Sequence, residues 1–163
     1  LLADHPEAGY NQRMTDIQGA LGSAQMDRAA EIVAERQRLA EIYDRAFSGL
    51  EWLRTPACPE GYQHGYQSYP CMVRPDNLSL RNVQAVNAER NAWMEELQNA
   101  GISTRPATHA VHMLTDYKNK YGLVLSNFPN AYIANDCSIS LPLFHGMSEA
   151  EQAYVIDCVL KSF

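Results

Sequence analysis

Residues 15–50 read TDIQGALGSAQMDRAAEIVAERQRLAEIYDRAFSGL, and they carry the strongest structural signal in the sequence. They open with Thr15-Asp16-Ile17-Gln18, which has the form of a capping box. Apolar residues then recur at helical spacing: Ile17, Ala20, Leu21, Ala24, Ile32, Leu39, Tyr43, Ala46 and Leu50. Because Gly19, Gly22 and Ser23 weaken a helix, we expect a break near residues 23–27, with a short helix before it and a long one after it.

The rest of the chain alternates short strands with helices. Strands are predicted at 52–55, 66–73, 102–105 and 137–141, and helices at 83–99, 112–121, 129–136 and 148–161. The last helix opens on Ser148-x-x-Glu151, a second capping box. Pro70 lies inside the strand at 66–73, which predicts an edge position or a bulge.

This order predicts an α+β fold of the sandwich type, with a small, mostly antiparallel sheet covered by helices. We expect one domain over residues 1–163. Within it, residues 1–14 form an irregular lead-in, residues 15–50 a helical segment, and residues 51–163 a sheet-and-helix part.

The composition argues against a nucleic-acid-binding protein and against a membrane-spanning one. The chain has 163 residues and a net charge of −6, so a general nucleic-acid binder is not expected. No apolar run approaches the roughly 18 residues that span a bilayer, and the first residues do not read as a signal peptide. The four cysteines form no C-x-x-C pair and predict reduced thiols in a cytoplasmic protein.

The common catalytic motifs are missing from the sequence. It contains no G-x-S-x-G elbow and no phosphate-binding G-x-x-x-x-G-K-[ST] loop. His109-x-x-His112 could place two imidazoles on one face, but no H-E-x-x-H pattern accompanies them, so we predict no metal site. Their position after Pro106 suggests a loop, where a polar contact to a ligand is the alternative to a purely structural role.

The segment before the first helix, Gly9-Tyr10-Asn11-Gln12-Arg13-Met14, is polar and irregular. Asn11 offers an amide donor and Arg13 a planar guanidinium, and both groups suit a phosphate or a carboxylate. The alternative is a plain lead-in to the helix.

Residues 9–22 resemble the signature of the DegT/StrS sugar aminotransferase family. Three further stretches resemble later motifs of that family, in the correct order: 67–69 (QSY), 101–112 (GISTR, then THAVH) and 140–148 (SLPLFHGMS). Gln12 departs from the aromatic residue often found at its position, which bears on local packing and substrate fit.

The resemblance is to the C-terminal part of that family, the small domain of fold-type-I pyridoxal 5′-phosphate (PLP) enzymes. It implies a larger PLP-binding domain, with the lysine that forms the Schiff base, upstream of the signature. The lysines here are Lys118, Lys120 and Lys161, and none matches that position. We therefore expect no catalytic residue in this chain and no transamination by it alone.

The resemblance also implies the site residues and partners. Asn11 matches an asparagine that reaches across a dimer interface to the PLP phosphate, and Arg13 an arginine close to the same shared site. His109 and His112 match a segment that approaches the sugar nucleotide. The expected partner is a second copy of the chain or a complementing PLP-binding domain, with no membrane or nucleic acid involved.

The sequence is compatible with two other functions. The chain could be a non-enzymatic remnant that dimerises or binds a ligand, because losing a large domain exposes apolar surface. It could also belong to a PLP-dependent sugar dehydratase, in which histidine replaces the lysine.

Overall fold

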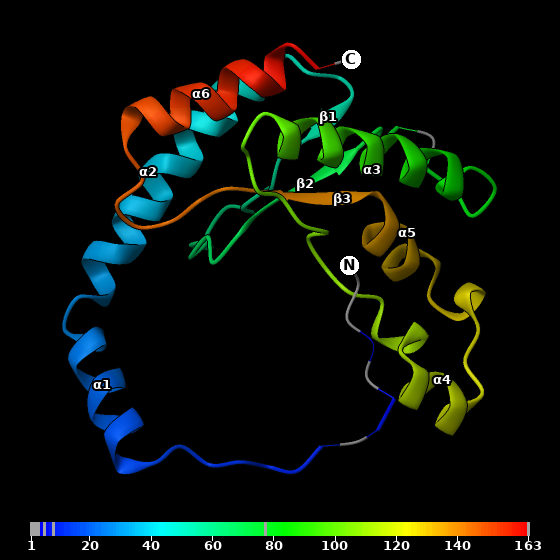
Figure 1. The fold of residues 1–163 in the computed structure, drawn as a ribbon, viewed down its shortest axis with the longest axis horizontal. Coiled ribbons are helices and arrows are strands. Elements are labelled where there is room, and N and C mark those ends of the chain that lie inside the picture. Colours follow the sequence, from blue (N-terminus) through cyan, green and yellow to red (C-terminus); the bar gives the residue numbers. More distant parts are fainter. Residues whose placement is uncertain (1–3, 5, 8, 77, 163) are drawn as a thin grey trace.

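The computed structural model describes residues 4, 6–7, 9–76 and 78–162. Its sheet has three antiparallel strands in the order β1-β2-β3: Leu53–Arg54, Tyr69–Val73 and Ser138–Leu141. The register pairs Leu53 with Val73 and Tyr69 with Leu141. β2 therefore begins at the end of the sheet where β3 finishes (Figure 1).

The helices are α1 (Asp16–Met26), α2 (Ala29–Phe47), α3 (Val83–Asn99), α4 (Thr115–Tyr121), α5 (Pro129–Cys137) and α6 (Glu149–Leu160). Short 3-10 turns cover Val111–Met113 and Leu125–Asn127. This arrangement confirms the predicted α+β class, with a small antiparallel sheet and a helical N-terminal segment.

The first helical segment breaks where the sequence predicts. α1 ends at Met26 and α2 begins at Ala29. The capping box at Thr15 is formed, with the Thr15 hydroxyl accepting from the Gln18 amide and the Gln18 side chain accepting from the Thr15 amide. The second capping box, between Ser148 and Glu151, starts α6 in the same way.

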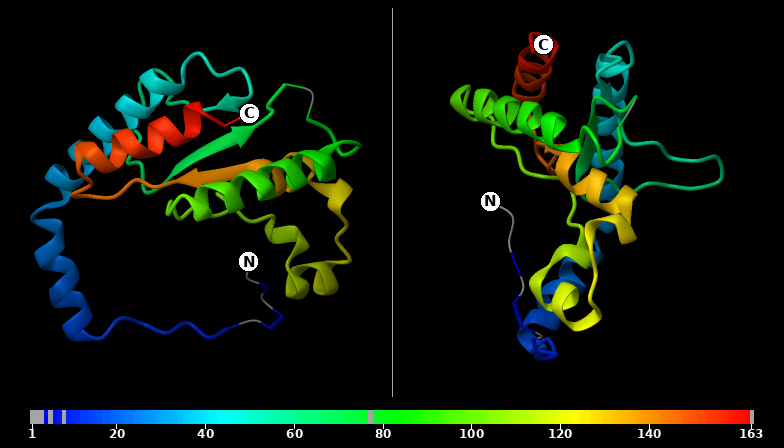
Figure 2. Two further views of the ribbon diagram at one scale, coloured as in Figure 1. Left: turned by 45° about the horizontal axis from the view of Figure 1, so that its top comes forward. Right: turned by 90° about the vertical axis from the view of Figure 1, so that its right-hand side faces the viewer.

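The core lies between the sheet and the helices α2, α3 and α6. Its largest buried side chains include Tyr43, Phe47, Tyr69 and Trp93. The Tyr43 and Phe47 rings stack with centroids 5.4 Å apart. α2 packs on α6, where the buried Gln152 side chain donates to the Leu39 carbonyl at 2.7 Å. α3 packs on α5 and β3 (Figure 2).

α1 has no buried residue, although its apolar residues recur at helical spacing. It extends from the start of α2 away from the sheet, and the chain before it runs back toward α4 (Figure 1). There Asp4 accepts a hydrogen bond from the Thr115 amide at 2.9 Å, at the start of α4. None of the helices in the described ranges is long and apolar enough to span a bilayer.

Two strand predictions need correction. The strand expected at 66–73 begins only at Tyr69, and Pro70 lies in the middle strand of the sheet rather than at an edge. The middle position tolerates Pro70 because β1 pairs only with Met72 and Val73, so no β1 residue lies opposite the proline. The strand expected at 102–105 shrinks to a single bridge between Arg105 and Ser140, because Pro106 follows and has no amide hydrogen to extend the ladder.

Candidate functional site

A polar cavity of about 250 Å³ lies at the end of the sheet where β2 begins and β3 finishes. Three segments form its wall: the entry to β2, the segment after α3, and the exit of β3. The lining residues are Gln67, Ser68, Ser103, Thr104, Arg105, Ser140, Leu141, Pro142 and Leu143. We call this cavity the Arg105 pocket.

Local backbone geometry brings Arg105 to the pocket. α3 ends at Asn99, and Gly101 has a φ of +80°, a left-handed conformation that glycine adopts without strain. The chain then runs to Arg105, whose carbonyl accepts from the Ser140 amide at 2.8 Å. This bridge fixes the Arg105 backbone beside β3.

The guanidinium of Arg105 donates to no group in the part of the chain that the structure describes. Arg105 is the only charged residue in the described wall, where the other polar side chains are hydroxyls and one amide. A planar, permanently charged donor among neutral hydroxyls suits a carboxylate or phosphate oxygen.

A second arginine, Arg36 of α2, holds the pocket's walls together. Its Nη1 donates to the carbonyls of Tyr66 at 2.9 Å, Gln67 at 3.1 Å and Leu143 at 3.3 Å. Tyr66 has a φ of +43°, a strained conformation for a residue with a side chain. Its amide donates to the His64 ring at 2.8 Å, so Arg36 and His64 together stabilise the turn that leads into β2.

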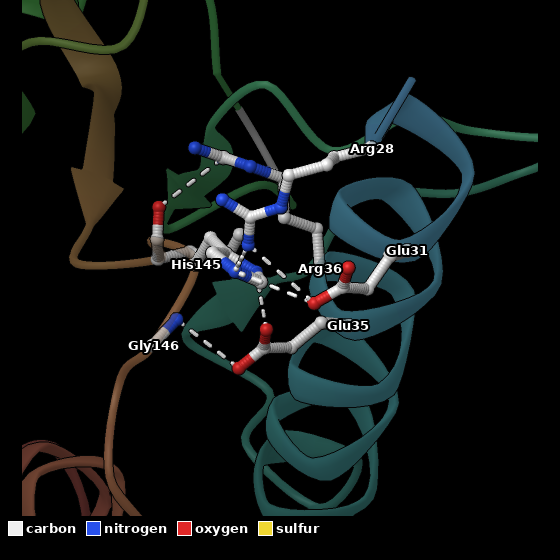
Figure 3. Close-up of polar contacts among 7 residues, drawn as sticks. Arg28, Glu31, Glu35, Arg36, His145 and Gly146 are labelled. Carbon is white, nitrogen blue, oxygen red and sulfur yellow. Dashed lines mark hydrogen bonds and ion pairs between the residues drawn. The ribbon is translucent and has the colours of Figure 1, made fainter. Parts of the chain in front are cut away.

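A charged cluster next to Arg36 ties α2 to the loop that follows β3 (Figure 3). The His145 ring lies between Glu35 and Arg28, with its Nδ1 against the Glu35 carboxylate and its Nε2 3.2 Å from Arg28 Nη2. This pattern fits a ring that donates from Nδ1 and accepts at Nε2. Glu35 also accepts from the Gly146 amide at 3.1 Å, so the loop carrying Leu143 is held at two points.

Asn11 and Arg13, the predicted cofactor contacts, lie on the extended segment before α1. Both side chains are exposed and make no hydrogen bond or ion pair with any described residue. Neither residue lines the Arg105 pocket.

The two predicted substrate histidines have different surroundings. His109 is exposed in the loop after Arg105. His112 is buried in the turn before α4, with its ring centroid 5.2 Å from that of Phe128. Its Nε2 is buried and has no hydrogen-bond partner among the described residues. No group of three or more potential metal ligands gathers in the described chain.

The structure therefore does not bring the four predicted site residues together in one pocket of the described chain. Sequence reasoning missed Arg105, Ser140 and Arg36 as site residues. A signal for the first two was present, because three of the motif stretches, 67–69, 101–105 and 140–144, meet at the Arg105 pocket. Nothing in the sequence pointed to Arg36, which reads as one charge on the polar face of a helix.

The architecture defines the class of protein. Its small antiparallel sheet covered by helices is an α+β fold that superposes on part of a solved protein described as a sugar aminotransferase.

Residues 3–160 match the model of the DegT/DnrJ/EryC1/StrS aminotransferase family, and the chain belongs to this family. An uncharacterized protein of Methanocaldococcus jannaschii is 30% identical over 155 residues, which cover 95% of this chain and 38% of the relative. GDP-perosamine synthase of Caulobacter vibrioides is 27% identical over 152 residues, which cover 93% of this chain and 38% of the relative.

A solved structure shows the same arrangement. The PLP form of Spr1654 from Streptococcus pneumoniae, a protein assigned as a sugar aminotransferase, superposes with a TM-score of 0.74 and 32% identity. The match covers 88% of this chain and 34% of that one. The chain thus spans between a third and two fifths of the length of these relatives.

Proposed function

We propose that this chain is the C-terminal part of a PLP-dependent aminotransferase that acts on a keto sugar nucleotide. The observation that carries the proposal is the outward-facing segment before α1. Asn11 and Arg13 lie there in a run from Gly9 to Arg28 without a buried residue. Donors presented in this way suit a site completed by another domain or another copy.

The donor groups of this segment fit the phosphate of PLP. A carboxamide and a guanidinium both donate hydrogen bonds to phosphate oxygens, and no described acidic side chain pairs with either. Asn11 would hold the phosphate and Arg13 would lie beside it. When bound, PLP supplies the electron sink for amino transfer, and this chain orients it.

The lysine that binds PLP covalently would come from outside this sequence. Lys118 and Lys120 lie on α4, and the Lys120 ammonium lies 5.3 Å from the Tyr121 ring centroid. Lys161 pairs with Asp157 at 2.5 Å, and this hydrogen bond raises the pKa of Lys161. A nucleophilic lysine needs a lowered pKa instead, so Lys161 is a poor candidate.

The exposed apolar residues of the N-terminal segment support a covering partner. Tyr10, Met14, Ile17, Leu21 and Met26 are each at least 70% exposed. Ile17 and Leu21 are one helical turn apart on α1, which makes a contiguous patch. A second copy or a PLP-binding domain would cover it in the assembled, cytoplasmic protein.

His109 and His112 are proposed to contact the sugar nucleotide. His109 is accessible as the structure stands, whereas the Nε2 of His112 is enclosed and would need the loop around Phe128 to open. The sugar dehydratase remains a second candidate within the same family. The candidate that is not an enzyme is a module that dimerises or binds a ligand, and it would dimerise through the exposed α1 patch.

The test uses the chain combined with a separately expressed, lysine-bearing PLP domain of a relative, with a GDP-linked keto sugar and glutamate as probes. We expect amination only from the combination. Asn11→Ala should weaken PLP retention about tenfold or more, whereas Asn99→Ala, at an exposed position on α3, should not. Equal PLP retention by both variants would remove Asn11 from the phosphate site.

A further inference from the structure

The Arg105 pocket has the features of a preformed anion site. The residues that line it include one arginine, four residues with hydroxyl groups and Gln67, and no acidic residue lines it in the described chain. The hydroxyls belong to Ser68, Ser103, Thr104 and Ser140, and none of them donates to or accepts from another described residue. All of these residues line the same cavity.

The positions of these groups are set by the fold rather than by a ligand. Arg105 and Ser140 are joined by the backbone bridge, and Ser140 is 6% exposed. Gln67 and Leu143 are held by Arg36, which adds a second positive charge behind the wall. The backbone of the pocket therefore needs little rearrangement to bind a ligand, and the exposed Arg105 side chain is the part that binding would order.

The volume limits what the pocket can hold. A cavity of about 250 Å³ is smaller than the roughly 300–1,000 Å³ of pockets for drug-sized ligands. It therefore suits a small anion, or the anionic end of a larger ligand.

We propose that the Arg105 pocket binds a small oxyanion, a carboxylate or a phosphate group, with Arg105 as the charged donor and the surrounding hydroxyls as neutral donors. A planar guanidinium can donate two parallel hydrogen bonds to either group. The proposal concerns binding by this chain itself and does not depend on the aminotransferase assignment. In an aminotransferase, the bound anion would be either the carboxylate of the amino donor or a phosphate of the sugar nucleotide.

The experiment titrates the full 163-residue chain with glutamate and, separately, with inorganic phosphate, at constant ionic strength. Amide chemical shifts in two-dimensional NMR report the binding. We expect saturable amide shifts at residues 67–68, 103–105, 140–141 and 143 with at least one of the two probes. The stronger probe identifies the source of the anion.

Variants locate the contact. Arg105→Ala should weaken binding of that probe at least tenfold, and Arg105→Lys should recover part of the loss because charge remains without the fork geometry. Arg38→Ala, which removes an exposed arginine of α2 outside the pocket, should leave the affinity unchanged. The dispersion of the amide spectrum shows that each variant is folded.

Three results would overturn the proposal. The first is the absence of saturable shifts with either probe. The second is unchanged affinity in Arg105→Ala. The third is an equal loss in Arg105→Ala and Arg38→Ala, which would indicate general charge screening instead of a pocket.

Discussion

Several buried tyrosine and cysteine side chains in the core have raised pKa values, which favours their neutral form. Tyr69 is fully buried and donates to the Asp44 carboxylate at 2.5 Å, and burial with this hydrogen bond raises its pKa. Burial likewise raises the pKa of Tyr43 and of Cys71. In Cys137, burial and the nearby Asp136 raise the pKa of the thiol from 9.0 to about 11.

These raised pKa values predict a loss of stability at alkaline pH. Between about pH 9 and 11 the Cys137 thiol ionises in the unfolded chain before it ionises in the folded one. The contribution of this thiol to the free energy of unfolding is therefore fully present below pH 9. It is lost as the pH rises through this window, and its size is on the order of 2 kcal/mol. This loss is measured by urea unfolding of the wild type and of Cys137→Ala at several pH values.

Cys58 provides the control, because it is exposed. Cys137→Ala should lower stability at pH 7 and flatten its decline above pH 9, whereas Cys58→Ala should keep the wild-type slope. A slope unchanged by Cys137→Ala would refute the role assigned to this thiol.

At the scale of elements, the two capping boxes are chemically alike but lie in helices with different surroundings. Ser148 starts α6, which buries Gln152, Val155 and Val159 against the core. Thr15 starts α1, which buries nothing. A cap in a packed helix contributes to global stability, whereas a cap in an unpacked helix affects only local helix content.

We therefore predict different effects of removing the two caps. Ser148→Ala should lower the free energy of unfolding by about 1 kcal/mol, measured by urea denaturation. Thr15→Ala should leave that value within experimental error and instead speed amide hydrogen exchange within α1. Equal losses of global stability in both variants would mean that α1 is packed in solution.

Local signals were enough to predict most of the elements. The apolar spacing and Gly101 give α3 its observed bounds, and the two S/T-x-x-Q/E boxes mark where α1 and α6 begin. The ends of the short strands are harder to predict, because they depend on the strands with which they pair. Pro70 predicts an edge position or a bulge, whereas it lies in the middle strand, because the two-residue length of β1 cannot be inferred from the proline itself.

The candidate site was less predictable than the fold. Chemical type and the family resemblance point to Asn11 and Arg13, and their role stays a prediction. The Arg105 pocket depends on pairings across long stretches of chain, such as Arg36 with Leu143, 107 residues apart. Such contacts form only when the sheet and α2 pack together, so they cannot be predicted from residue type and local spacing.

At the scale of the whole molecule, the sheet-and-helix part has a packed core, whereas the N-terminal segment and α1 carry exposed apolar side chains. A patch of this kind tends to associate in water. The net charge of −6 does not oppose contact there, because α1 itself carries only Asp16 as a charged residue.

We predict that the chain self-associates through α1. Replacing both Ile17 and Leu21 by Glu should shift sedimentation velocity from an oligomer toward the 18.3 kDa monomer. Tyr62→Glu, at another exposed apolar residue, should leave the oligomer intact. A monomeric wild-type chain at tens of micromolar would contradict this prediction and leave α1 for a different domain to cover.

We propose that this chain contributes contacts to a PLP site and that its own three lysines do not bind PLP covalently. The most direct measurement incubates the purified chain with PLP, reduces it with borohydride and maps pyridoxyl-lysine by peptide mass spectrometry, with a denatured sample as the reference. We predict that Lys118, Lys120 and Lys161 are labelled no more in the folded chain than in the denatured one. Stoichiometric labelling of one of these lysines, in the folded chain alone, would contradict it.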